Sequence, residues 1–263
     1  SALVISKGAV VAVTREGKKP AVVVPADRLE SPWRVCVSPK TGEVFVAENS
    51  DRAGSGTAAR HHQVKRFSAD GKLLGTFGRP GGREDGLYEP ADFRGLTDIE
   101  ADPVGGFVAT EADQTPPRRT ARFNDAGKLV REWCGAQHYG ALACPEPSDP
   151  RFVWTLANAP RAGLVRWEVD YAKGTWRPAE VYQDAFAANR FAAAPGVPTV
   201  FEHGGRTYIH GGALYGGLAL AVYDPKAQRV RPCVTSGKRD GRGAYLWTDL
   251  NDDGLATDEE VTW

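Results

Sequence analysis

The chain carries one sequence motif twice, as RFSADGKLLGTFG at residues 66–78 and as RFNDAGKLVREWCG at residues 122–135. Each copy begins with alternating polar and apolar residues, passes through a polar turn that ends in Gly71 or Gly127, and resumes as a second apolar stretch that ends near an aromatic residue. This order is typical of a β-hairpin whose turn needs a residue with positive φ. The motif therefore predicts two equivalent hairpins.

Further hairpins extend the repeat in both directions. Looser copies of the motif occupy residues 165–176 and 221–230. An additional hairpin precedes each of the four copies, at residues 35–47, 98–109, 152–157 and 199–210. Two consecutive hairpins make a four-stranded unit of about 45 to 55 residues, the size of one propeller blade. The predicted blades cover residues 1–30, 31–80, 90–136, 145–185, 197–237 and, as a partial sixth, 243–263.

The sequence pattern of these blades resembles the NHL-type repeat, most closely over residues 32–135. The matching positions are Pro39, Gly42, Val44, Val46, Ala47, Glu48, Val64, Arg66, Phe67, Gly71, Phe77 and Gly78. The resemblance implies an all-β fold, a propeller of four-stranded blades that usually closes with six. A single propeller domain over residues 1–263 is the resulting expectation, either with the sixth blade incomplete in this chain or with an irregular closure of the ring.

The composition agrees with a turn-rich β protein and excludes several classes. The 263 residues include 30 glycines and 18 prolines, and 33 basic residues balance 33 acidic ones. A zero net charge and short basic clusters argue against nucleic-acid binding. No apolar stretch is long enough for a membrane-spanning helix. The chain has no methionine, so Ser1 is expected to be a processed or trimmed start and the chain a piece of a longer protein.

The four cysteines have no metal-like or CxxC spacing. Cys134 and Cys144 lie ten residues apart in a loop rich in glycine and alanine, and could form a disulfide. The alternative is a pair of free buried thiols. A disulfide would indicate an extracytoplasmic location, since disulfides persist in oxidising compartments.

The segment DLNDDGLATDEE at residues 249–260 matches the twelve-position calcium loop. The predicted ligands are side-chain oxygens and one backbone carbonyl, from Asp249, Asn251, Asp253, Leu255, Thr257 and Glu260. Gly254 stands at the sharp bend of such a loop, and Glu260 can supply two oxygens. The alternative interpretation is an acidic, solvated turn. The sequence favours Ca²⁺, because an ordinary acidic turn rarely fills all these positions together.

The residues that flank the calcium loop are β-formers and not the helices of a paired calcium sensor. The loop resembles those of dockerins and of secreted bacterial repeat proteins. This resemblance implies a structural ion in calcium-rich surroundings, which favours a secreted or periplasmic location.

Catalytic candidates are few. Asp98 and Glu100 alternate with Ile99 in a predicted strand and so share a face. They could hold a second divalent cation, as in lactonase-like propellers, or simply line a water-filled channel. Histidines from separate blades could hold a metal, as in the amidating lyases that the repeat resembles; the set is His61, His62, His138, His203 and His210. Their spacing gives no support to a metal site.

Two hypotheses follow from the sequence. The first is a non-catalytic, calcium-stabilised propeller that binds a protein or a carbohydrate as a module of a larger protein or assembly. The second is a metal-dependent lyase or lactonase that uses Asp98, Glu100 or His203. The repeat and the calcium loop favour the first hypothesis, since no catalytic constellation accompanies them.

Overall fold

The protein is all-β, as the repeats and turns predict. The computed structural model describes residues 2–16, 18–53, 61–111, 117–135, 143–156, 163–183, 195–213, 217–239 and 241–263. It contains 56% strand and 4% helix, in antiparallel sheets none of which closes on itself. Within the described residues, no helix has the length and apolar character needed to cross a membrane.

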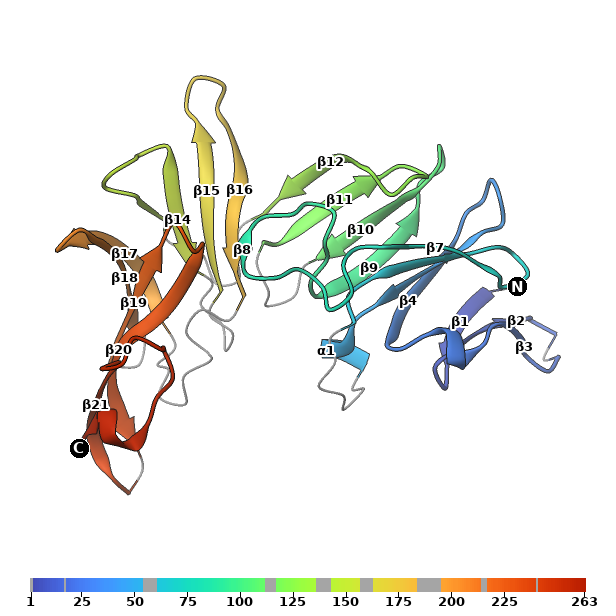
Figure 1. Ribbon diagram of the computed structural model, residues 1–263. Helices are drawn as coiled ribbons and strands as arrows, with labels where there is room; N and C mark the ends of the chain where they lie inside the picture. The colour runs from blue at the N-terminus through green and yellow to red at the C-terminus, as the bar shows by residue number, and fades with distance from the viewer. Residues whose placement is uncertain are drawn as a thin grey trace. The chain divides into compact units, whose positions relative to one another are not determined.

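The chain divides into two compact units. The first unit comprises Ser1–Arg83, Glu89–Asp113 and Arg118–Gly135, and the second comprises Glu84–Tyr88, Gln114–Pro117 and Ala136–Trp263. In both units, strands that follow one another in sequence pair side by side, and Figure 1 shows this meander clearly for β9 to β12. Short connections of this kind are expected from the many turn glycines.

The first unit contains three sheets in its described residues. They are formed by β1 (Ala2–Ser6), β2 (Ala9–Val13) and β3 (Ala21–Val24); by β4 (Pro32–Val37), β5 (Val44–Glu48), β6 (Val64–Phe67) and β7 (Leu73–Phe77); and by β9 (Leu96–Ala101), β10 (Phe107–Glu111), β11 (Arg119–Phe123) and β12 (Leu129–Cys134). Two short helices, a 3₁₀ turn at Ala26–Arg28 and α1 at Ser50–Ala53, lie in the connections.

The second unit contains two larger sheets in its described residues. One is formed by β13 (Ala143–Pro145), β14 (Phe152–Leu156), β15 (Leu164–Asp170) and β16 (Thr175–Tyr182), with β8 (Gly86–Leu87) at its edge. The other is formed by β17 (Pro195–His203), β18 (Arg206–Ala213), β19 (Leu218–Asp224), β20 (Arg229–Arg239), β21 (Gly243–Thr248) and β22 (Val261–Thr262). A 3₁₀ turn at Asp258–Glu260 precedes β22.

The two repeated hairpins use their glycines in the same way. Gly71 and Gly127 both have positive φ, of 85° and 72°, as the motif predicts. A Cβ atom on Gly127 would lie 2.1 Å from Cδ1 of Phe77, and one on Gly71 would lie 2.0 Å from the carbonyl oxygen of Val23. Each glycine therefore serves the turn and also lets the hairpin approach the preceding sheet.

Sheets pack on one another through apolar faces. In the first unit, an aromatic cluster joins the β4–β7 sheet to the β9–β12 sheet, with Phe77 of β7 packed against Phe107 of β10 at 5.3 Å between ring centroids. In the second unit, buried residues of β14 to β16, including Trp154 and Tyr182, pack against β17 to β20. The core thus lies between sheets in both units.

The C-terminal residues depart from the expected sixth blade. Instead of starting a separate sheet, β21 pairs with β20, and β22 pairs with β21. The reason is that β20 is eleven residues long and its second half, Val234 to Arg239, offers β21 an antiparallel edge. The predicted partial unit at residues 243–263 is therefore an extension of the fifth sheet.

The four cysteines are free thiols in this structure. Cys36 is buried, and the other three are half-buried. Burial, together with the negative charges of Glu100 and Asp98, raises the pKa of Cys36 to about 12. Cys36 is therefore protonated at neutral pH and behaves as a small apolar residue.

Candidate functional site

The predicted calcium loop forms a tight, internally hydrogen-bonded turn after β21. Asp253 N donates to Asp249 Oδ1 and to Asn251 Oδ1, both at 3.1 Å, and Gly254 N donates to Asp249 Oδ2 at 3.1 Å. Gly254 has a φ of 76°, which suits glycine at the bend of the loop. The carboxylate at the first position thus organises the middle of the loop.

The far end of the loop closes back on its beginning through Glu260. Its carboxylate accepts hydrogen bonds from Leu250 N at 3.0 Å, Thr257 N at 3.1 Å and Trp247 Nε1 at 3.1 Å. Thr257 and Glu260 also form a capping box at the start of the 3₁₀ turn. These hydrogen bonds, led by that from Thr257 N, hold the pKa of Glu260 below its usual range. Glu260 is therefore ionised at neutral pH.

An arginine from the adjacent strand contacts the loop. Nη1 of Arg231 forms an ion pair with Asp249 Oδ2, and Nη2 lies 2.6 Å from Asp252 Oδ1. The Asp249 side chain is fully buried and the Asp252 side chain is 63% exposed. Arg231 neutralises one buried carboxylate, and its hydrogen bond lowers the pKa of Asp252.

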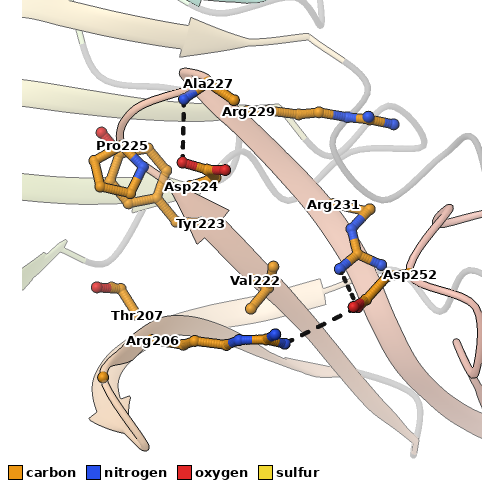
Figure 2. Close-up of a pocket in the computed structure, with 11 residues that line it drawn as sticks. Arg206, Thr207, Val222, Tyr223, Asp224, Pro225, Ala227, Arg229, Arg231 and Asp252 are labelled. Atoms are coloured by element: carbon orange, nitrogen blue, oxygen red, sulfur yellow. Dashed lines mark hydrogen bonds and ion pairs between the residues drawn. The ribbon is translucent and has the colours of Figure 1, made fainter.

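A hollow of about 470 Å³ adjoins the loop (Figure 2). Its lining includes Arg206, Val222, Pro225 and Arg229, together with Arg231. Figure 2 shows the Arg206 and Arg231 side chains converging on the carboxylate of Asp252. The hollow combines an apolar wall with basic groups.

The predicted catalytic carboxylates lie in the first unit, on β9. Asp98 and Glu100 are both exposed and flank the buried Ile99, so they share a face as predicted. Asp98 Oδ1 accepts a hydrogen bond from Ile99 N and lies 3.7 Å from Arg34 Nε. An exposed pair beside an arginine has the surroundings of an ordinary surface ion pair.

Two of the described histidines, His61 and His62, lie in the first unit, and two, His203 and His210, lie in the second. His62 is fully buried; its Nδ1 accepts a hydrogen bond from Gly95 N, and its Nε2 lies 3.6 Å from Asp51 Oδ2. His61 is half-buried next to it, whereas His203 is exposed on β17 and His210 is half-buried on β18. The fifth, His138, lies outside the described residues.

In the described ranges, no three or more His, Cys, Asp or Glu side chains are grouped as a metal-binding cluster. No protein-family model matches the chain, and no curated protein matches it. The site must therefore be argued from its own geometry. That geometry gives most weight to the loop at residues 249–260 and the hollow beside it.

The sequence prediction missed Arg231, Asp252 and the basic hollow. Alternation in β20 places Arg229 and Arg231 on one face, and this part was readable from the sequence. The pairing of Arg231 with the loop is a contact between separate elements, so the local pattern around either partner does not reveal it.

Proposed function

We propose that the chain is an extracytoplasmic, NHL-like propeller module of a longer protein, in which the loop at residues 249–260 binds one structural Ca²⁺ ion. The module serves as a binding or scaffold element. The single observation that carries the proposal is the folded loop itself, in which Asp249 and Glu260 hold the middle and the end of the chain segment by backbone hydrogen bonds.

The packing of the first strands supports the propeller part of the proposal. In the first unit, β4 contacts both β1 and β9, and in the second unit, β17 contacts β13 and β14. Strands that open consecutive four-stranded meanders lie side by side in a propeller, around its axis. The contacts of β4 and β17 agree with this arrangement.

The donor set fits Ca²⁺ in chemistry. The predicted ligands are carboxylate, amide, hydroxyl and carbonyl oxygens, the hard donors that Ca²⁺ prefers, and none is nitrogen or sulfur. Asp249 currently pairs with Arg231, so Ca²⁺ binding would exchange one cation for another at a buried carboxylate. A bound ion would tie the end of β21 to the start of β22 and stabilise this edge of the sheet.

Terbium luminescence tests the site directly, because the indole of Trp247 can sensitise an ion in the loop. Its Nε1 lies 3.1 Å from Glu260. We expect saturable Tb³⁺ emission that Ca²⁺ displaces. We also expect Ca²⁺ to raise the melting temperature relative to an EDTA-treated sample. A hundredfold excess over Kd corresponds to about 2.7 kcal/mol of added stability.

Asp253→Ala should abolish both responses. The matched control is Asp170→Ala, because Asp170 is a partly exposed carboxylate at the end of β15 in the same unit and also accepts a backbone hydrogen bond. If the wild-type melting temperature is the same in Ca²⁺ and EDTA and Tb³⁺ emission does not saturate, the calcium proposal is wrong.

A further inference from the structure

The Asp252 side chain is a feature of the loop that a calcium ion does not need. It stands at the fourth position, which supplies no ligand in loops of this type. Its φ is 63°, a rare conformation for a residue with a side chain, and its carboxylate contacts Arg231 at 2.6 Å and Arg206 at 4.0 Å. Asp252 thus lies at the edge of the hollow shown in Figure 2.

The arginines of this hollow have N–H groups that could donate to a ligand. Arg231 already pairs with Asp249 and Asp252, whereas Arg206 is 59% exposed, and its ion pair among the described residues is the 4.0 Å contact with Asp252. Arg229 is exposed on the same face of β20, two residues before Arg231. Within the described part of the chain, neither Arg206 nor Arg229 donates a side-chain hydrogen bond. Each guanidinium offers five N–H groups in a planar fork.

We propose that this hollow binds a small organic carboxylate, seated between Arg206 and Arg231 where the carboxylate of Asp252 now lies. Asp252 shows that a carboxylate fits between these two guanidinium groups. The hollow has a volume of about 470 Å³, which is larger than an inorganic ion needs and suits the body of an organic ligand. Pro225 and Val222 supply an apolar wall for that body, and Arg229 adds positive charge at the rim.

None of the groups that would bind the carboxylate is a predicted calcium ligand, but Arg231 links the two sites through its ion pair with Asp249. Asp252 acts as an internal competitor for the ligand. Removing its charge while keeping its shape should strengthen binding, whereas a structural role alone would not produce a gain.

The test is a chemical-shift titration of ¹⁵N-labelled protein at constant ionic strength, with D-glucuronate as the carboxylate probe and D-glucose as its neutral counterpart. We expect D-glucuronate to shift resonances near residues 205–207 and 229–231 saturably, with a Kd of about 1 mM. D-glucose should cause no such shift. The titration is run in Ca²⁺ and in EDTA, so that a failure to bind Ca²⁺ is distinguished from a failure to bind D-glucuronate.

Arg206→Gln should weaken D-glucuronate binding about tenfold, as loss of a charge-assisted hydrogen bond does. Asp252→Asn should strengthen it about threefold to tenfold. Arg177→Gln is the matched control, since Arg177 is an exposed arginine of β16 outside the hollow, and it should leave binding unchanged. Should Arg206→Gln fail to fold, the gain expected for Asp252→Asn still decides.

Any of four results would overturn the assignment. The first three are that D-glucuronate does not bind saturably, that D-glucose binds as well as D-glucuronate, and that Asp252→Asn gives no gain. Tighter binding of inorganic phosphate than of D-glucuronate would also overturn it, because the hollow would then be a site for tetrahedral anions.

Discussion

Glu111 in the first unit and Asp249 in the second are both buried carboxylates held by arginine and by backbone N–H groups. Glu111 accepts from Arg83 at 3.0 and 3.1 Å, from Arg94 N at 2.5 Å and from the Arg119 side chain. Asp249 has two backbone N–H groups and one arginine, Arg231. The two carboxylates therefore differ in the number and burial of their cationic partners.

The partners of the two carboxylates differ in burial. Glu111 lies at the end of β10, and the side chains of Arg83 and Arg119 are almost completely buried. Asp249 lies in a loop, and its partner Arg231 also contacts the exposed Asp252. The same chemistry is thus a buried lock in one unit, whereas the calcium proposal makes it an exchangeable contact in the other.

Breaking the Glu111 lock should cause the largest loss in the free energy of unfolding. Glu111→Gln leaves Arg83 and Arg119 buried without their shared counter-charge, and removal of one partner of a buried pair costs about 3–5 kcal/mol. Urea unfolding measures this loss. The control is Glu168→Gln, because Glu168 pairs with Arg177 at the surface and should cost less than about 1 kcal/mol.

The pH dependence of stability checks the same lock. Burial raises the pKa of Glu111, but the charges of Arg119 and Arg83 outweigh burial, so its folded-state pKa is below the ordinary value. Its stabilising contribution is therefore present above the unfolded-state pKa and is lost as pH falls through the folded value. Glu111→Gln should flatten this acid limb, and an unchanged limb would show that other carboxylates produce it.

Glycine substitution in the loop should have an intermediate effect. Gly254 and Gly241 have similar φ values, 76° and 78°, so alanine at either position carries the strain of a left-handed residue, about 1–2 kcal/mol. Only at Gly254 would the new Cβ meet Arg231, at 2.5 Å from its Cγ. We expect Gly254→Ala to cost about 1 kcal/mol more than Gly241→Ala in urea unfolding. Equal costs would mean that Arg231 adapts freely.

These two regions also mark what the sequence could predict. The hairpin glycines and the loop positions were readable because a positive φ or a ligand spacing is a local property of the chain. Gly127 and Gly254 have the backbone conformation expected of them. The Glu111 lock joins residues 28 positions apart, and the contact of Arg231 with Asp252 spans 21. Such contacts depend on how strands pair and how sheets pack, which one sequence does not specify.

The sharpest test of exchange should come from Arg231→Gln. Without calcium, loss of this ion pair should cost less than loss of the Glu111 lock, since Asp249 has one arginine partner and keeps its two backbone N–H groups. With calcium, the effect of Arg231→Gln on stability reverses in sign. Removal of a positive charge beside the loop should tighten Ca²⁺ binding roughly tenfold, because the ion no longer competes with the arginine for Asp249.

Arg229→Gln is the matched control for that measurement, because it removes the same charge two residues earlier on β20 without a contact to Asp249. Calcium titration calorimetry of both variants separates direct competition from general electrostatics. A tenfold gain for Arg231→Gln alone means that Arg231 competes with the ion at Asp249. Equal gains in both variants would mean that the arginines act only through their long-range field, and the contrast between the exchangeable Asp249 and the locked Glu111 would then fail.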